Sequence, residues 1–229
     1  MLAKKKKLSK KQIKEDKLVT SFYEVQKFYE EYQSKIIIGL VAVAVVVVAV
    51  FWYTSKIEQD NKAASTELTR VIPIFDEGSY VEAIDGRPGT NITGLRQVVE
   101  NYSGSEQGEV ARLYLANALY ALGKIDEAYE EYDNFSGSNK ILAASALAGK
   151  AACYEVDKNF EEAAKSYSKA ADLDVTNPQN SDYLLSAAKN AINASNNSMA
   201  EELLKTLKKD YANSTAAREA DKYLAYINA

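Results

Sequence analysis

The residues that most often do chemistry in enzymes are nearly missing from this sequence. The chain of 229 residues has no histidine and a single cysteine, Cys153. Without histidine it lacks the commonest general base, the usual metal ligand and the base of Ser-His and Cys-His nucleophile pairs. It also has no phosphate-binding glycine loop and no metal-ligand spacing. The sequence therefore predicts a protein that is not an enzyme and that binds no cofactor, no metal and no small-molecule substrate.

The remaining candidates for chemistry are carboxylates and the one thiol. Adjacent glutamates occur at 130/131, 161/162 and 201/202. These pairs recur at one position of the repeat described below, so we interpret them as solvated helix surface. Cys153 stands between Ala152 and Tyr154 in an apolar stretch, which is typical of a small buried side chain.

Charge is distributed unevenly along the chain. Residues 1–35 contain 10 lysines and 5 acidic residues, a local net charge of +5. The rest of the chain therefore has 18 basic and 27 acidic residues, a net charge of −9. Nucleic-acid binding needs a basic face, so an acidic domain argues against a nucleic-acid partner.

An uncharged apolar run follows the basic segment. Residues 36–53 read IIIGLVAVAVVVVAVFWY, and Thr54 and Ser55 extend the run. At about 1.5 Å per residue a helix of this length spans about 30 Å, which matches the hydrocarbon core of a bilayer. A buried strand would be shorter, and a cleavable signal peptide would have a small-residue cleavage site. We therefore predict an uncleaved transmembrane helix over residues 36–55.

Lysine asymmetry predicts the orientation of that helix. In the 20 residues after it, only Lys56, Lys62 and Arg70 are basic, whereas ten lysines precede it. By the positive-inside rule, residues 1–35 form a cytoplasmic arm and residues 56–229 lie outside the cytoplasm. We expect a single-pass inner-membrane protein with a periplasmic domain. The preceding lysines are Lys4, Lys5, Lys6, Lys7, Lys10, Lys11, Lys14, Lys17, Lys27 and Lys35.

The arm has an apolar helix face of its own. Leu18, Phe22, Val25, Tyr29 and Tyr32 recur at spacings of 4, 3, 4 and 3, which puts them on one side of a helix. One interpretation is a helix that its lysines attract to anionic lipid. The other is a docking helix for a membrane partner, and the sequence leaves both open.

Two stretches of the remaining domain repeat at an offset of 35 residues, over 115–135 and 150–170. Each has an apolar helix, a short polar turn and a second helix. A looser third copy places Ala200 37 residues after Ala163, with a loop at Pro178. The paired positions are Ala116/Ala151, Leu119/Tyr154, Ile125/Phe160, Ala128/Ala163 and Tyr132/Tyr167, with Gly123 at the first turn and Lys158 at the second.

The flanks of the repeats are less regular. Residues 57–75 continue helically with a kink expected at Pro73, residues 86–89 form a loop, and residues 95–102 form a short helix. These two helical segments are interpreted as an irregular first hairpin. Residues 216–227 are expected to cover the open end of the stack.

The repeat pattern resembles the tetratricopeptide repeat, with small residues where the two helices of a hairpin cross. The predicted fold class is all-α, with one transmembrane helix followed by a tetratricopeptide-like α-solenoid. The complete layout resembles the YfgM-like family of ancillary SecYEG translocon subunits, most closely over residues 100–132. That resemblance implies a protein-interaction function beside the translocon, with secreted chains or periplasmic chaperones as partners.

The repeat register suggests which residues would line a groove for a protein partner. They lie on the first helix of each hairpin and are Asn117, Tyr120, Glu155, Lys189 and Asn193. A second hypothesis uses the same fold as a scaffold for envelope biogenesis, unrelated to the translocon. The sequence does not separate these two functions.

Overall fold

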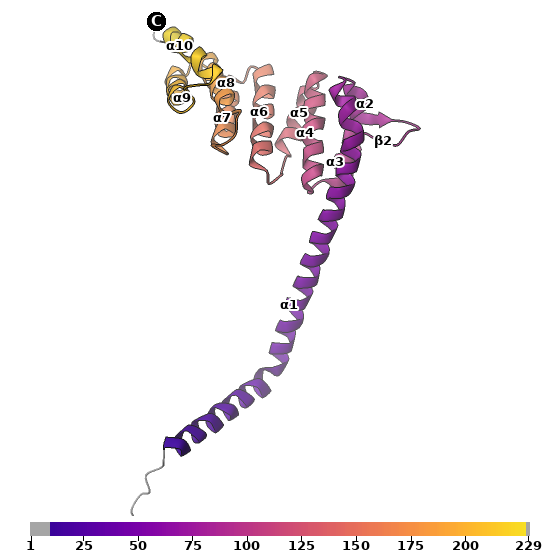
Figure 1. The fold of residues 1–229 in the computed structure, drawn as a ribbon, viewed down its shortest axis with the longest axis vertical. Helices are drawn as coiled ribbons and strands as arrows, with labels where there is room; N and C mark the ends of the chain where they lie inside the picture. The colour runs from indigo at the N-terminus through magenta and orange to yellow at the C-terminus, as the bar shows by residue number, and fades with distance from the viewer. Residues whose placement is uncertain (1–9, 228–229) are drawn as a thin grey trace, which may run out of the picture. The chain divides into compact units, whose positions relative to one another are not determined.

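The computed structural model describes residues 10–227, which form ten helices and one pair of two-residue strands (Figure 1). The prediction of an all-helical fold is confirmed for this part of the chain. Four of the lysines of the arm, Lys4 to Lys7, lie outside the described residues. The helices are α1 (Lys10–Asp76), α2 (Tyr80–Asp85), α3 (Leu95–Tyr102), α4 (Glu106–Ala121), α5 (Ile125–Asp133), α6 (Lys140–Val156), α7 (Phe160–Asp172), α8 (Asn180–Asn193), α9 (Asn197–Asp210) and α10 (Thr215–Ile227).

Helix α1 contains the apolar run, and it is the one helix within the described residues that is long and apolar enough to cross a membrane. Side chains of the run, such as Val46, Val48 and Phe51, are exposed and belong to no core cluster of the described residues. Exposed valines in such a row are unfavourable in water, whereas a bilayer accommodates them. The chain divides into two compact units, and the boundary falls between Ser55 and Lys56.

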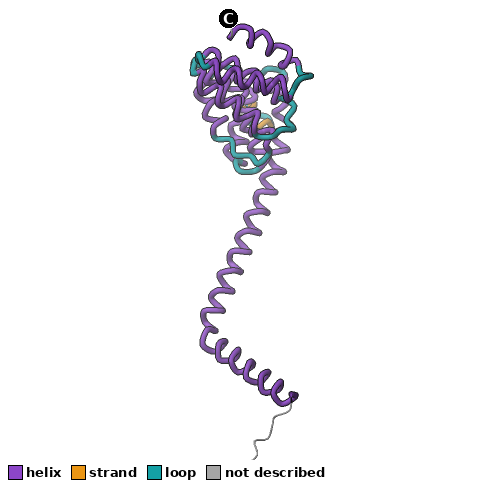
Figure 2. Tube along the Cα trace, turned by 90° about the vertical axis from the view of Figure 1, so that its left-hand side faces the viewer, coloured by secondary structure: helices purple, strands orange, loops and turns teal. Residues whose placement is uncertain are grey.

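In the second unit each helix from α3 to α10 packs against the next along the chain. Figure 2 shows these helices joined by short loops. Side-chain caps mark the starts of some of these helices: Ser105 accepts from the Gly108 amide at α4, and Asn196 accepts from the Met199 amide at α9. Asn139 caps α6 in the same way through the amides of Ile141 and Leu142.

Three helix pairs, α4/α5, α6/α7 and α8/α9, are joined by the same turn. Its central residue is Gly123, Lys158 or Ser195, and φ is 74°, 59° and 58° respectively. In the first turn the Gly123 amide donates to the Tyr120 carbonyl and the Lys124 amide to the Leu119 carbonyl, and the other two turns repeat both bonds. This is a Schellman motif, in which a left-handed residue ends the helix.

The residues predicted to pack between helices lie mostly inside. Ala116, Ala128, Ala151, Ala163 and Ala200 have no exposed surface. The rings of Tyr132 and Tyr167 are buried, and those of Tyr154 and Phe160 are half-buried. Small side chains let two helices approach closely, so a larger residue at these alanines would force them apart.

Sequence reasoning missed one close approach. The ring of Tyr132 on α5 packs on Gly149 of α6, where an added Cβ would lie 2.3 Å from the ring carbons. A glycine in the middle of a helix costs about 1 kcal/mol relative to alanine. Here the missing side chain makes room for the tyrosine of the preceding helix pair.

The segment before α4 differs from expectation at residues 86–89. Gly86–Arg87 (β1) pairs antiparallel with Ile92–Thr93 (β2), so these residues begin a hairpin and are not simply a loop. An added Cβ at Gly86 would lie 2.7 Å from the Gly94 nitrogen, and this tight backbone contact requires glycine. Strands of two residues carry no alternating pattern that a sequence could reveal.

Helix α1 continues past Pro73 and ends at Asp76, so the proline lies in its last turn. Ala64, Leu68 and Val71 of α1 are buried in one core with Leu95 and Val98 of α3. The side chain of Asn61 also accepts a hydrogen bond from the Gln107 amide at 2.8 Å. The C-terminal part of α1 is thus built into the second unit.

The left-handed residue at the second turn gives the first testable prediction. Lys158→Gly should raise the free energy of unfolding by about 1 kcal/mol, because a side chain with a Cβ is strained at this φ. Lys165→Gly is the matched control in the middle of α7 and should lower it by about 1 kcal/mol. Urea denaturation of the full chain in detergent, followed by circular dichroism, measures both. A loss at Lys158 as large as that at Lys165 would contradict the left-handed turn.

Candidate protein-binding groove

The five residues predicted to line a groove lie on the first helices of the three pairs. Asn117 and Tyr120 are on α4, Glu155 is on α6, and Lys189 and Asn193 are on α8. The two asparagines are exposed and the other three residues are half-buried. All five therefore have some surface in contact with solvent.

Two of these residues are held by tyrosines from the second helix of their own pair. The Tyr132 hydroxyl donates to Asn117 Oδ1 at 2.5 Å, and the Tyr167 hydroxyl donates to Glu155 Oε2 at 3.1 Å. The two tyrosines occupy equivalent repeat positions. Their hydroxyls thus orient polar side chains on the first helix of each pair.

Glu155 also links two helix pairs. Asn190 of α8 is 1% exposed, and its Nδ2 donates to Glu155 Oε1 at 2.5 Å. Sequence reasoning missed Asn190, because a polar residue on an apolar face gives no indication of its partner in another repeat. A buried amide without an acceptor is costly, so the carboxylate ties α8 to α6.

Burial raises the pKa of the tyrosines behind these contacts. Desolvation is the main cause for Tyr132 and Tyr167, and the nearby Glu155 charge raises the pKa of Tyr167 further. Desolvation is also the main cause of the raised pKa of the partly buried Tyr120. These hydroxyls stay protonated at neutral pH, where they act as hydrogen-bond donors.

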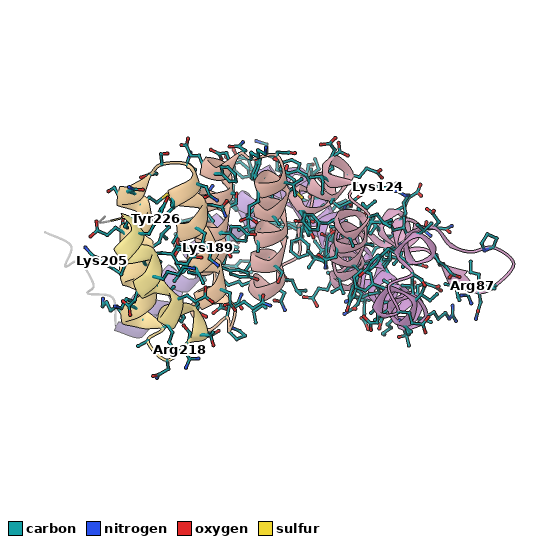
Figure 3. The ribbon with its side chains drawn as sticks, turned by 90° about the horizontal axis from the view of Figure 1, so that it is seen from above. Arg87, Lys124, Lys189, Lys205, Arg218 and Tyr226 are labelled. Atoms are coloured by element: carbon teal, nitrogen blue, oxygen red, sulfur yellow. The ribbon has the colours of Figure 1, made fainter. Side chains whose placement is uncertain are left out.

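A cleft of about 360 Å³ lies between α8 and α10. It contains two of the predicted groove residues, Lys189 and Asn193. Figure 3 labels Lys189 and Tyr226, which lie at the C-terminal end of the domain. The lining residues are Lys189, Ile192, Asn193, Lys222, Tyr223 and Tyr226.

The cleft is positively charged within an otherwise acidic domain. The ammonium groups of Lys189 and Lys222 lie 5.4 Å and 5.7 Å from the centre of the Tyr223 ring. Lys189 also lies 3.7 Å from a carboxylate oxygen of Glu219. Glu219 lies beside one of the two lysines, so the ammonium group of Lys222 gives the cleft a net attraction for anions.

The structure does not bring all five predicted residues into this cleft, because Asn117, Tyr120 and Glu155 lie on α4 and α6. It adds Lys222, Tyr223 and Tyr226, which sequence reasoning assigned only to a terminal helix that covers the stack. A lysine followed by tyrosines at spacings of one and four in α10 is the signal that could have identified them.

No group of three His, Cys, Asp or Glu side chains in the described residues is placed to hold a metal ion. Cys153 is 1% exposed, and burial raises the pKa of its thiol to about 11. A thiol of that kind is almost entirely protonated at neutral pH and is a poor nucleophile. The groups that the cleft presents to a binding partner are ammonium groups, aromatic rings and an amide.

Comparison with known proteins adds no family to this description, since no protein-family model and no curated protein matches the chain. The class that the structure defines is an all-helical protein with one helix able to cross a membrane. The resemblance to the YfgM-like family remains a prediction from the sequence.

The link between α6 and α8 gives a second testable prediction. Glu155→Leu should lower the free energy of unfolding by about 2 kcal/mol, because the Tyr167 hydroxyl loses its acceptor and the Asn190 amide keeps only the Ser186 carbonyl. Glu155→Gln keeps one oxygen and should cost roughly half as much. Glu162→Leu is the control, since its exposed pair with Lys165 is screened by solvent and should contribute little to the free energy of unfolding. Equal losses at both glutamates in urea denaturation would exclude a structural role for Glu155.

Proposed function

We propose that this protein is a membrane-anchored protein-protein interaction module. Residues 36–55 span the inner membrane, residues 1–35 lie in the cytoplasm, and residues 56–229 form a tetratricopeptide-type solenoid outside it. The observation that carries the proposal is the cleft between α8 and α10, which combines two lysines, two tyrosines and an asparagine around about 360 Å³.

The repeat interpretation is supported by the three equal turns. Gly123, Lys158 and Ser195 stand 35 and 37 residues apart and share the same left-handed backbone and hydrogen bonds. Fully buried alanines follow them at equal distances, at positions 128, 163 and 200. Repeating units of this length that pack on their neighbours are typical of helical solenoids, which bind polypeptides on the surface of their first helices.

The chemistry of the cleft favours a polypeptide as its occupant. Tyrosines supply broad contact surface with little loss of conformational freedom, and asparagine can pair with a peptide backbone. The two lysines favour a segment that carries a carboxylate. The net charge of −9 outside the arm disfavours nucleic acid.

The resemblance to the YfgM-like family extends the proposal to a place and a partner. The protein would hold its solenoid beside the SecYEG translocon, where emerging chains or periplasmic chaperones reach the cleft. The competing hypothesis is an envelope-biogenesis scaffold with the same fold and other partners. The identity of the protein that contacts the membrane helix distinguishes these two hypotheses.

Photo-crosslinking in living cells tests the cleft. A photoreactive amino acid at Tyr226 should give a protein adduct that the double variant Lys189→Glu, Lys222→Glu reduces at least about tenfold, as expected when two attractive charges become repulsive. The same amino acid at Lys124, an exposed position on another turn (Figure 3), is the matched control and should give no such adduct. An adduct at Tyr226 that survives charge reversal would remove the cleft from the mechanism.

A second crosslinking position identifies the protein complex that lies beside the membrane helix. A photoreactive amino acid at Val45, in the middle of the apolar run, should give an adduct with a SecYEG subunit if the translocon proposal holds. Adducts only with envelope-assembly proteins would support the scaffold instead. Control substitutions at Val43 and Val47, which lie on the opposite side of the helix from Val45, show whether one helix face makes the contact.

A further inference from the structure

Helix α1 presents an exposed apolar stripe before the membrane run. Phe22 and Val25 are each 67% exposed and Tyr29 is 49% exposed, and Tyr32 continues the stripe on the same helix face. Aromatic contacts along this helix are local: Phe28 stacks on Tyr32 with ring centres 4.8 Å apart. An aromatic stripe this exposed is unfavourable in water and indicates a surface that another phase or molecule covers.

The charge that precedes the stripe identifies what covers it. Residues 1–17 carry eight lysines and two acidic residues, a net charge of +6, whereas residues 18–35, which contain the stripe, carry two lysines and three glutamates. The ammonium group of Lys35 lies 5.1 Å from the centre of the Tyr32 ring, at the end of the stripe next to the apolar run. A lysine-rich segment of this kind attracts anionic lipid headgroups.

A second copy of this chain is a poorer occupant for the same reason. Two arms side by side would bring together two segments that each carry +5. Like charges repel strongly near an apolar contact, where the effective dielectric constant is low. Anionic lipid removes this repulsion and also supplies an apolar phase for the aromatic rings.

The covalent continuity of α1 puts the bilayer within reach of the stripe. Phe22 precedes Ile36, the first residue of the apolar run, by 14 residues in one helix, or about 21 Å of helix. If α1 bends between Tyr32 and Ile36, the whole stripe reaches the headgroup layer. Amphipathic helices with a lysine-rich polar face and aromatic residues on the other face lie in this layer.

We propose that the face formed by Phe22, Val25, Tyr29 and Tyr32 is a binding surface for anionic lipid and lies flat in the headgroup layer on the lysine-rich side of the membrane. The lysines hold the arm at the surface, and the aromatic side chains immerse in the interface. The arm thereby fixes the membrane helix at one boundary of the bilayer. This inference uses no residue of the cleft and does not depend on its partner.

Tryptophan fluorescence tests the proposal, because Trp52 is the single tryptophan of the chain. In a Trp52→Phe background, Phe22→Trp puts a reporter on the stripe, and Glu24→Trp puts the matched reporter on the polar face of the same helix. The full chain is reconstituted into phosphatidylcholine vesicles with or without about 30% phosphatidylglycerol, the anionic component. Lipids brominated near the top of their acyl chains then quench any tryptophan that is immersed.

The expected result is strong quenching and a blue shift for the Phe22→Trp reporter in anionic vesicles, at least about twofold more than in neutral vesicles or for the Glu24→Trp reporter. Salt at about 1 M should reduce the difference, because the screening length falls to about 3 Å. Replacing Lys10, Lys11 and Lys14 with glutamine should also reduce the difference in quenching between anionic and neutral vesicles.

Three outcomes would overturn the proposal. Equal quenching of the two reporters would mean that the helix has no immersed face. Strong quenching that is independent of phosphatidylglycerol and of salt would remove the anionic headgroup from the interaction. A blue-shifted reporter that bromine does not quench, and whose shift grows with the protein-to-lipid ratio, would show that a second copy covers the stripe.

Discussion

The close approach of neighbouring helices at small side chains is the constraint on which the domain depends. Each helix pair has an alanine without exposed surface in its second helix, at 128, 163 or 200, and the glycine at 149 receives the Tyr132 ring. With larger residues the helices would separate, and the next pair would lose the surface on which it packs. In such a stack each helix pair contacts only the adjacent pairs, so its stability depends on the interfaces with those pairs.

The polar groups of the domain divide into those that hold the stack and those that face solvent. Glu155 is used inside, since it accepts hydrogen bonds from Tyr167 and Asn190. Glu109 has a similar role: it is 3% exposed, pairs with Arg112 and accepts from the Ser136 amide, which ties the end of α5 to α4. Within residues 10–227, Lys222 and Tyr226 make no hydrogen bond of this kind and line the proposed cleft, where they can contact a partner.

Helix α1 meets a different solvent requirement in each of its parts. Its C-terminal part is buried through Ala64 and Leu68 in the core of the second unit. Its middle part exposes a row of valines, which favours hydrocarbon over water, and its first part exposes an aromatic stripe that follows a lysine-rich segment. One continuous helix therefore carries three surfaces, and the side chains alone determine which environment suits each of them.

The sequence by itself determined the helical fold class, the apolar run and the small residues at the repeat positions. These features are local: a period of 3.6 residues, an uncharged stretch of sufficient length and a recurring alanine are all visible in one dimension. Only the tertiary structure decided that α10 lies against α8, which brings Tyr223 and Tyr226 next to Lys189. It also decided that Asn190 donates to Glu155 and that the Tyr132 ring packs on Gly149. Each of these contacts depends on how two helices cross, and crossing geometry follows from the packing of whole surfaces, which no single repeat position encodes.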